Sequence, residues 1–240
     1  MATEPSAVTH TRSIGIVGGM SPESTTAYYR KIVALHEKRF GDHSYPRIVI
    51  VSVSFQRYIE SQHGGDWKRI GAELQLEFER VADAGADFAI LATNTMHKVL
   101  PSIRSPIPVL SILDAVAAAA KSASVRTVAL TGTQFTMTDG FYQAGLETRG
   151  LRVLLPDSSS QEFIHKVIYD HLIYGRVPPD AVVRFAACSE QMIRRGADTM
   201  LLACTELEML ATTTFPVPVL NSTDIHAEAA WRMAIGDLSI

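Results

Sequence analysis

Cys204 is the side chain of this 240-residue chain whose place in the sequence best suits acid–base chemistry. It follows the apolar run Thr199–Ala203, a predicted strand, and precedes Thr205 and Glu206, where a helix is expected to begin. A helix N-terminus lowers the pKa of a thiol, because its N–H groups and dipole stabilise the thiolate. A thiolate here could take a proton from a bound molecule. The other cysteine, Cys188, lies within a predicted helix and is interpreted as a small buried apolar residue.

An internal repeat gives Cys204 an equivalent residue, Thr93. The motif Gly-Ala-Asp occurs at 85–87 and again at 196–198, and a short apolar run follows it in each half. Thr93 and Cys204 each stand eight positions after the glycine of their motif, directly after an alanine. A repeat of this length predicts a duplicated structural unit. We therefore expect Thr93 and Cys204 at equivalent places in two similar lobes.

Apolar runs alternate with amphipathic segments along the chain, which is typical of an α/β protein whose parallel sheets are covered on both faces. Ligands bind beyond the carboxyl ends of such strands, so the two lobes should place Thr93 and Cys204 on opposite sides of one cleft. Strands are predicted at 13–18, 47–55, 88–92, 108–110, 127–130, 152–155, 199–203 and 218–220, and helices at 24–40, 67–84, 115–122, 141–149, 161–174, 180–195 and 226–235.

Two proton-transfer groups on opposite faces of a bound carbon atom could invert its configuration. One group removes the Cα proton of an amino acid, and the other returns a proton to the opposite face. Backbone N–H groups that follow the strands could hold the carboxylate of the amino acid and the negative charge that develops on it. The pattern therefore favours the racemisation of a small-molecule amino-acid substrate.

Five short segments carry polar residues in a specific arrangement. They are Gly-Gly-Met-Ser-Pro-Glu-Ser-Thr at 18–25, Thr-Asn-Thr-Met-His-Lys at 93–98, Thr-Gly-Thr followed by Thr-Met within 131–137, Ala-Cys-Thr-Glu at 203–206 and Asp-Ile-His-Ala-Glu at 224–228. Taken together, these segments resemble the motifs of the aspartate/glutamate racemases. The resemblance runs from about Ile14 to about Ala230.

The resemblance implies two Rossmann-like lobes, each a mostly parallel sheet flanked by helices, related by pseudo-two-fold symmetry and separated by a cleft. Residues 13–112 with 220–240 would form the first lobe, residues 113–219 the second, and residues 1–12 a flexible tail. The resemblance also implies that the protein is a homodimer, and that it uses no pyridoxal phosphate, metal ion or other cofactor.

The resemblance assigns roles to individual residues. Cys204 would take the proton from the L-enantiomer of an acidic amino acid, aspartate or glutamate, and Thr93 would deliver a proton on the opposite face. Asn94, Thr95 and Thr205 would hold the oxygens of the substrate carboxylate. The other substrate-binding residues that it implies are Met20 in the glycine loop, Gln62 in a loop at 58–67, Thr131, Thr133 and Glu206.

Thr93 departs from the usual family pattern, which has a cysteine at this position. One branch of the family, with the segment Thr-Asn-Thr-Met-His-Lys, shares the replacement. A hydroxyl is a far weaker acid than a thiol, so it can relay a proton to a carbanion but is a poor base toward a Cα–H bond. We therefore expect a bias, with conversion from the L- to the D-enantiomer faster than the reverse.

The composition argues against several other classes of protein. A formal net charge of −3 gives no reason to expect a nucleic acid or an anionic membrane as a partner. Two cysteines rule out a disulfide framework, and the spacing of the Cys and His residues does not fit a zinc site. No apolar segment reaches the length needed to span a bilayer. These features favour a cytoplasmic protein.

Two other functions remain open on the same scaffold. An arylmalonate-type decarboxylase uses one cysteine to protonate the carbanion that loss of CO2 leaves, although it needs an apolar pocket. A non-catalytic protein could instead close its two lobes on a dicarboxylic acid. Aspartate and glutamate differ by one methylene, which the sequence does not distinguish. His97 is either an orienting residue or a surface residue, and Arg57 and Arg176 are interpreted as surface residues.

Overall fold

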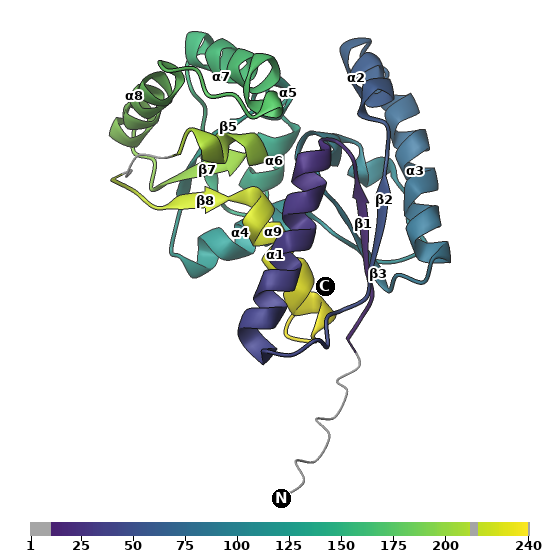
Figure 1. Ribbon diagram of the computed structural model, residues 1–240. Coiled ribbons are helices and arrows are strands. Elements are labelled where there is room, and N and C mark those ends of the chain that lie inside the picture. The colour runs from purple at the N-terminus through teal and green to yellow at the C-terminus, as the bar shows by residue number, and fades with distance from the viewer. Residues whose placement is uncertain (1–10, 212–215, 240) are drawn as a thin grey trace, which may run out of the picture.

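A computed structural model describes residues 11–211 and 216–239, which form two α/β lobes (Figure 1). Of the tail predicted at 1–12, only Thr11 and Arg12 lie within the described residues. The backbone N–H of Arg12 donates to the carbonyl of Ala234 at 2.8 Å, so this end of the tail is attached to the last helix. Within the described residues, no helix is long and apolar enough to cross a membrane.

The two sheets have the same strand order and are parallel throughout. The first consists of β1 (Ile14–Gly18), β2 (Ile48–Ser52), β3 (Phe88–Leu91) and β4 (Val109–Leu110), in the order β2-β1-β3-β4. The second consists of β5 (Thr127–Gly132), β6 (Arg152–Leu154), β7 (Thr199–Ala203) and β8 (Val219–Asn221), in the order β6-β5-β7-β8. Strands β3 and β7 thus occupy the same place in their sheets, and the predicted fold class is confirmed.

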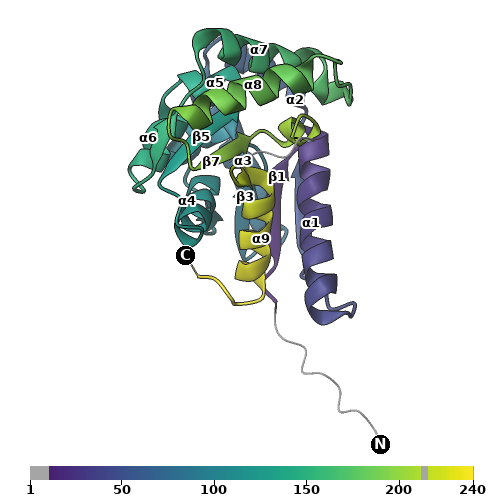
Figure 2. The ribbon, with the colours of Figure 1, turned by 90° about the vertical axis from the view of Figure 1, so that its left-hand side faces the viewer.

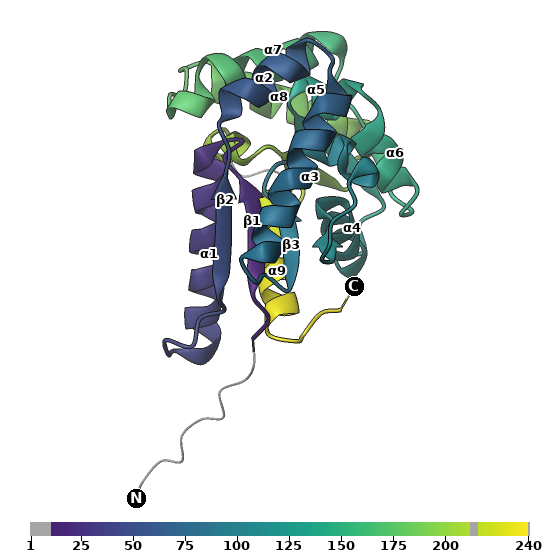
Figure 3. The ribbon, with the colours of Figure 1, turned by 90° about the vertical axis from the view of Figure 1, so that its right-hand side faces the viewer.

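Helices cover both faces of each sheet. They are α1 (Pro22–Phe40), α2 (Phe55–His63), α3 (Trp67–Asp83), α4 (Ile112–Ser122), α5 (Gln134–Thr138), α6 (Phe141–Glu147), α7 (Ser158–Asp170), α8 (Ala181–Arg194) and α9 (Ser222–Ala234), with 3₁₀ turns η1 (Thr95–Lys98), η2 (Leu100–Ser102), η3 (Leu172–Tyr174) and η4 (Thr205–Met209). Helices α1 and α9 pack on one face of the first sheet and α3 on the other (Figures 2 and 3). On the second sheet, α4 and α6 cover one face, and α7 and α8 cover the other.

Two helices cross from one lobe to the other. Helix α4 follows β4 of the first sheet but packs on the second, and α9 follows β8 of the second sheet but packs on the first. The two helices also pack against each other, which joins the lobes. The limits of the lobes, predicted at 112–113 and 219–220, stay a prediction. Strand β8 crosses the second limit, because it runs from Val219 to Asn221.

The repeated Gly-Ala-Asp motif has the same structural role in both lobes. In the first, Asp87 donates its N–H to the Ser13 carbonyl at 2.9 Å and accepts the N–H of Ser13 at 2.6 Å. In the second, Asp198 donates its N–H to the Thr127 carbonyl at 2.9 Å and accepts the N–H groups of Arg126 and Thr127 at 2.9 and 2.8 Å. Each aspartate therefore fixes the register between the first and third strands of its sheet, and with it the height at which the third strand ends.

Two short helices differ from the elements that the sequence predicts. The segment 58–67, expected as a loop, is helical over most of its length, because α2 extends from Phe55 to His63. Helix α5, of five residues, follows β5 where no element is predicted. Both helices are shorter than the window of about 11 residues over which the helical period of apolar residues is recognised.

Candidate active site

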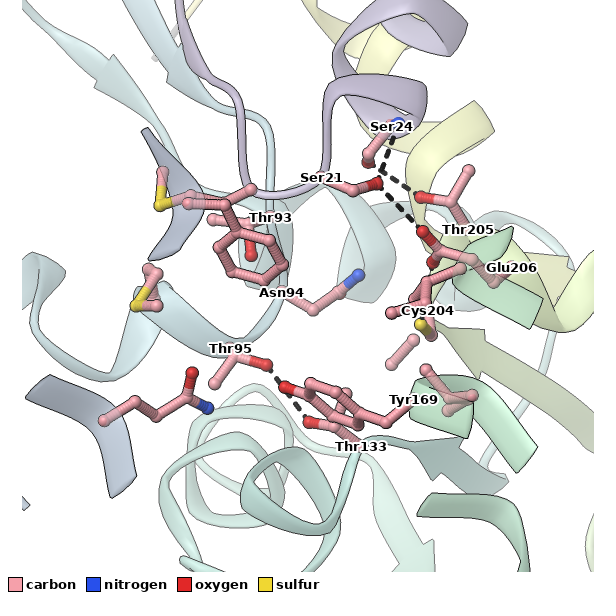
Figure 4. Close-up of a pocket in the computed structure, with 17 residues that line it drawn as sticks. Ser21, Ser24, Thr93, Asn94, Thr95, Thr133, Tyr169, Cys204, Thr205 and Glu206 are labelled. Atoms are coloured by element: carbon pink, nitrogen blue, oxygen red, sulfur yellow. Dashed lines mark hydrogen bonds between the residues drawn. The ribbon is translucent and has the colours of Figure 1, made fainter. Parts of the chain in front are cut away.

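A pocket lies at the carboxyl ends of both sheets, between the two lobes (Figure 4). Its walls come from the segments that follow β1, β3, β5 and β7, as expected for parallel sheets, and from α2 and α7. The lining residues are Met20, Ser21, Ser24, Phe55, Gln62, Thr93, Asn94, Thr95, Met96, Thr133, Ile168, Tyr169, Ile173, Ala203, Cys204, Thr205 and Glu206.

The structure brings nine of the ten predicted site residues together in this pocket. Thr93 and Cys204, which follow β3 and β7, lie on different sides of it (Figure 4). The exception is Thr131, predicted to bind substrate, which does not line the pocket. Thr131 lies within β5, is fully buried, and donates its hydroxyl to the carbonyl of Leu201 in the neighbouring strand at 3.0 Å. Its hydroxyl thus supports the sheet rather than the site.

The Cys204 sulfur is hydrogen-bonded to a carboxylate. Its thiol donates to Oε2 of Glu206 at 3.0 Å, and the Ser21 hydroxyl donates to Oε1 of the same carboxylate at 2.9 Å. Burial and the negative charge of Glu206 raise the pKa of Cys204 well above its usual value. The expectation of a lowered pKa was therefore wrong. Only a five-residue 3₁₀ turn follows the cysteine, and the group that accepts the hydrogen bond of its thiol is a carboxylate.

Hydroxyl groups connect the glycine loop after β1 to the opposite lobe. The Ser24 hydroxyl is 2.7 Å from the Thr205 hydroxyl, which is 3.1 Å from that of Thr223 on α9. Together with the bond from Ser21 to Glu206, these contacts tie both lobes together at one end of the pocket. The loop is therefore held beside the sulfur by side chains of the second lobe.

A second group of hydroxyls lies on the other side of the pocket. The hydroxyls of Thr95, Thr133 and Thr136 form a triangle with sides of 3.1, 3.2 and 3.3 Å. Asn94 accepts the phenol O–H of Tyr142 on its side-chain oxygen at 2.9 Å, so its amide N–H₂ group is available to the pocket. These polar groups, with the N–H groups after β3, suit an anionic oxygen of a ligand.

The comparison with known proteins identifies the family. The sequence profile of the Asp/Glu/hydantoin racemase family matches residues 17–230. This chain belongs to that family. Its relatives include the broad specificity amino-acid racemase RacX of Bacillus subtilis (strain 168), which is 26% identical over 226 residues, covering 90% of this chain and 95% of that protein. The racemase chemistry expected from the repeat thus matches the family, and the chain is an isomerase of the racemase type.

Solved structures of related racemases share the arrangement of both lobes. A candidate Asp/Glu racemase from Yersinia pestis superposes with a TM-score of 0.88 and is 32% identical, covering 93% of this chain and 99% of its own. An aspartate racemase homologue from Pyrococcus horikoshii OT3 gives a TM-score of 0.79 at 31% identity, with the same coverage of 93% and 99%. The pocket of this racemase therefore lies where the family's two lobes meet.

Tyr169 is a pocket residue of the racemase that the sequence does not reveal. It projects from α7 beside Cys204 and Thr133 (Figure 4). Burial, with the neighbouring Cys204 and Glu206, raises the pKa of Tyr169 to about 12, so its phenol keeps its proton. Its position in an amphipathic helix gives no signal of function. Ser21 and Ser24, in contrast, lie within the glycine-loop motif and could have been chosen from it.

His97 is a buried orienting residue of the racemase, not a surface residue. The N–H of Ile112 can only donate, so it requires Nε2 of His97, 3.0 Å away, to accept. The proton therefore lies on Nδ1, which donates to the carbonyl of Thr93 at 2.7 Å. Burial lowers the pKa of His97 to about 4, which keeps the ring neutral. His97 thus fixes the backbone of Thr93.

Acid should destabilise the racemase in a pH range set by its buried histidines. Burial lowers the pKa of His97 to about 4 and that of His226 to about 3, against about 6.5 for an unfolded histidine. Below about pH 6.5 the unfolded chain binds protons that the folded chain does not, so stability falls as the pH drops toward 4. At about 1.4 kcal/mol per pKa unit, the total loss is several kcal/mol. Urea unfolding between pH 7.5 and 4.5 measures it.

His97→Gln should make this pH dependence shallower, whereas His43→Gln, at an exposed position, should leave it unchanged. A stability that stays constant from pH 7.5 to 4.5 would contradict the neutral, buried state of these rings.

Within the part of the chain that the structure describes, no three His, Cys, Asp or Glu side chains come together as a group that could hold a metal ion.

Proposed function

We propose that this protein racemises a free amino acid, with Cys204 and Thr93 as the proton-transfer groups on opposite faces of Cα. The observation that carries the proposal is their placement, since the two residues follow equivalent strands and line one pocket. Asn94, Thr95 and Thr205 line the same pocket and would hold the α-carboxylate. Cys204 would accept the Cα proton and Thr93 would supply the proton that replaces it, so the proposed reaction uses no cofactor. A homodimer stays a prediction.

The proposed reaction begins with the proton of the Cys204 thiol. Glu206 accepts that proton through the existing 3.0 Å hydrogen bond, and the thiolate then takes the Cα proton of the L-enantiomer as the C–H bond breaks. The resulting carbanion takes the hydroxyl proton of Thr93 on the opposite face, which gives the D-enantiomer. Thr93 then regains a proton from solvent, and Glu206 releases its proton to solvent. Each group returns to its starting state, so the protons balance.

The substrate class is open between two possibilities that the relatives suggest. The Pyrococcus horikoshii protein is an aspartate racemase homologue, in line with the acidic substrate that the family resemblance implies, whereas RacX is a broad specificity amino-acid racemase. Hydrogen exchange at Cα in D2O, followed by NMR over L- and D-amino acids, tests the proposal without assuming either. An enzyme replaces the Cα proton of its L-substrate by deuterium and forms the D-enantiomer.

The equilibrium between the enantiomers limits which rate constants can show the proposed bias toward the D-enantiomer. The equilibrium constant of a racemisation is one, which makes kcat/KM equal for the two enantiomers. The bias must therefore appear in the saturated rates, with the L-substrate turned over faster. No exchange with any amino acid would indicate a binding protein, and release of CO2 from arylmalonates would indicate a decarboxylase instead.

Glu206→Gln should lower kcat at neutral pH by about 100-fold, because the variant has no acceptor for the thiol proton. Activity should recover in part at alkaline pH, because hydroxide can then take the thiol proton in place of the missing carboxylate. A pH–rate profile of both proteins measures this. Glu208→Gln is the control, because Glu208 lies on the same 3₁₀ turn but accepts from Asn221. Wild-type activity in Glu206→Gln would exclude Glu206 as the acceptor.

A further inference from the structure

The pocket has an unusual charge for a site that would take a dicarboxylic amino acid. None of the described residues that line it is a lysine, an arginine or a histidine, and the formally charged one among them is the acidic Glu206. An aspartate or glutamate zwitterion carries a net negative charge, so it would enter a pocket of the same sign. A buried carboxylate without a positive partner loses its hydration without compensation.

Four basic side chains on or next to the elements that form the pocket do not line it. Arg57 lies on α2, is 62% exposed and donates to Glu73 at 3.1 Å. Lys98 donates to Asp139 at 2.7 Å and covers the ring of Trp67. Burial lowers the pKa of His165, which disfavours a positive charge on its ring. Arg176, after η3, is exposed. None of these four side chains lines the pocket, so none of them is placed there to pair with a second carboxylate.

Gln62 supplies a different kind of group to the same pocket. Its side chain is 3% exposed, and its amide nitrogen Nε2 is shielded from solvent without a hydrogen-bond partner. Gln62 lies near the phenol of Tyr169 and acts to lower its pKa, but no hydrogen bond of ordinary geometry joins the two side chains. A buried N–H group without an acceptor is costly and rare in native proteins. A ligand oxygen in the pocket would satisfy it.

We infer that the site is built for an amino acid with an uncharged side chain, whose hydrogen-bonding oxygen is read by Gln62. This inference rests on the proposed racemase function and narrows its substrate class. The apolar side chains of Phe55, Ile168 and Ile173 line the same pocket and suit the carbon atoms of such a side chain. Side chains that end in a carboxamide or a hydroxyl have the required oxygen and no net charge.

Isosteric pairs of amino acids test the inference. The Cα exchange of L-asparagine is compared with that of L-aspartate, and L-glutamine with L-glutamate, by NMR in D2O. We expect kcat/KM for the uncharged member of at least one pair to be at least 10-fold higher than for its acid. A carboxylate member preferred in both pairs would overturn the inference and leave the racemase proposal intact.

Variants of Gln62 test its part in the selection. Gln62→Leu should reduce kcat/KM for L-asparagine about 10-fold while changing little for L-leucine, its apolar isostere. Gln56→Leu is the matched control, since Gln56 is exposed on the same helix and donates to Glu60. Arg57→Gln should leave the order of substrates unchanged, and a specific loss of activity toward L-aspartate in that variant would overturn the inference.

Ligand binding separates a failure of this inference from a failure of the racemase proposal. Thermal shifts of the full chain are recorded with the same four amino acids. Stabilisation by L-asparagine or L-glutamine at lower concentration than by the acids, with no exchange at Cα, would support the uncharged side-chain class and overturn catalysis. Stronger stabilisation by both acids would overturn the inference, whatever the rates.

Discussion

Cys204→Ser is expected to abolish both racemisation and Cα hydrogen exchange, with a loss of about 1,000-fold or more in kcat. A positioned acid–base group contributes about 10²- to 10⁴-fold, and Cys204 is the first base in the proposed path from the L-enantiomer. A serine hydroxyl can keep the hydrogen bond to Glu206, so the fold and the hydroxyl network should remain. Its much weaker acidity prevents it from becoming the base. Deuterium incorporation into the L-substrate and chiral chromatography measure the two activities.

Cys188→Ser is the matched control for this variant. Cys188 lies on α8, is 5% exposed, and its pKa is raised by burial away from the pocket. We expect it to keep its activity, with a small loss of stability from the buried hydroxyl. If Cys204→Ser retained more than about a tenth of the wild-type rate while folded, the proton would have to leave through another group, and the proposed mechanism would fail.

The architecture and the placement of Thr93 and Cys204 could be predicted because the same short motif occurs in both halves of the sequence. Gly-Ala-Asp recurs with the same spacing to the strand end, and each aspartate sets the register of its sheet by the same pair of backbone groups. Once the two sheets have equal registers, their third strands end at the same height. Thr93 and Cys204 then reach the same pocket without any long-range information.

The parts that sequence did not predict depend on tertiary contacts. Tyr169 reaches the pocket because α7 packs over the carboxyl end of the second sheet, and no local pattern encodes that placement. Thr131 is buried because β5 runs on to Gly132, whereas the sequence predicts a strand that ends at Leu130. The raised pKa of Cys204 depends on its burial and on the orientation of the Glu206 carboxylate, and the spacing of the two residues determines neither.

The protonation state of Cys204 differs from the one that the sequence predicts, and the difference bears on the proposed mechanism. The sequence predicts a thiolate stabilised at a helix N-terminus, whereas the structure holds a thiol that donates to Glu206. A resting thiol with a carboxylate partner requires that the proton move within the pair before Cα is attacked. In the proposed mechanism the base is therefore the Cys204–Glu206 pair, whose carboxylate accepts a hydrogen bond from Ser21 of the other lobe.

Thr93→Ala is expected to separate the two halves of the reaction. Racemisation should fall by about 100- to 1,000-fold, because no group remains to deliver a proton on the second face. Exchange of the Cα proton of the L-enantiomer should continue within a few-fold of the wild-type rate, with retention of configuration, since Cys204 can remove and return a proton on its own face. NMR follows the exchange, and chiral chromatography follows the product.

The structure makes this variant a clean test of the Thr93 hydroxyl. Thr93 is buried, and its backbone carbonyl is held by His97, so alanine should remove the hydroxyl without moving the strand end. Thr93→Ser should restore racemisation, and Thr93→Cys should raise the saturated rate from the D-enantiomer, because a thiol on this face is a better base than a hydroxyl. Racemisation at the wild-type rate in Thr93→Ala would mean that water or another side chain protonates the carbanion. Thr93 would then have no part in the proton transfer.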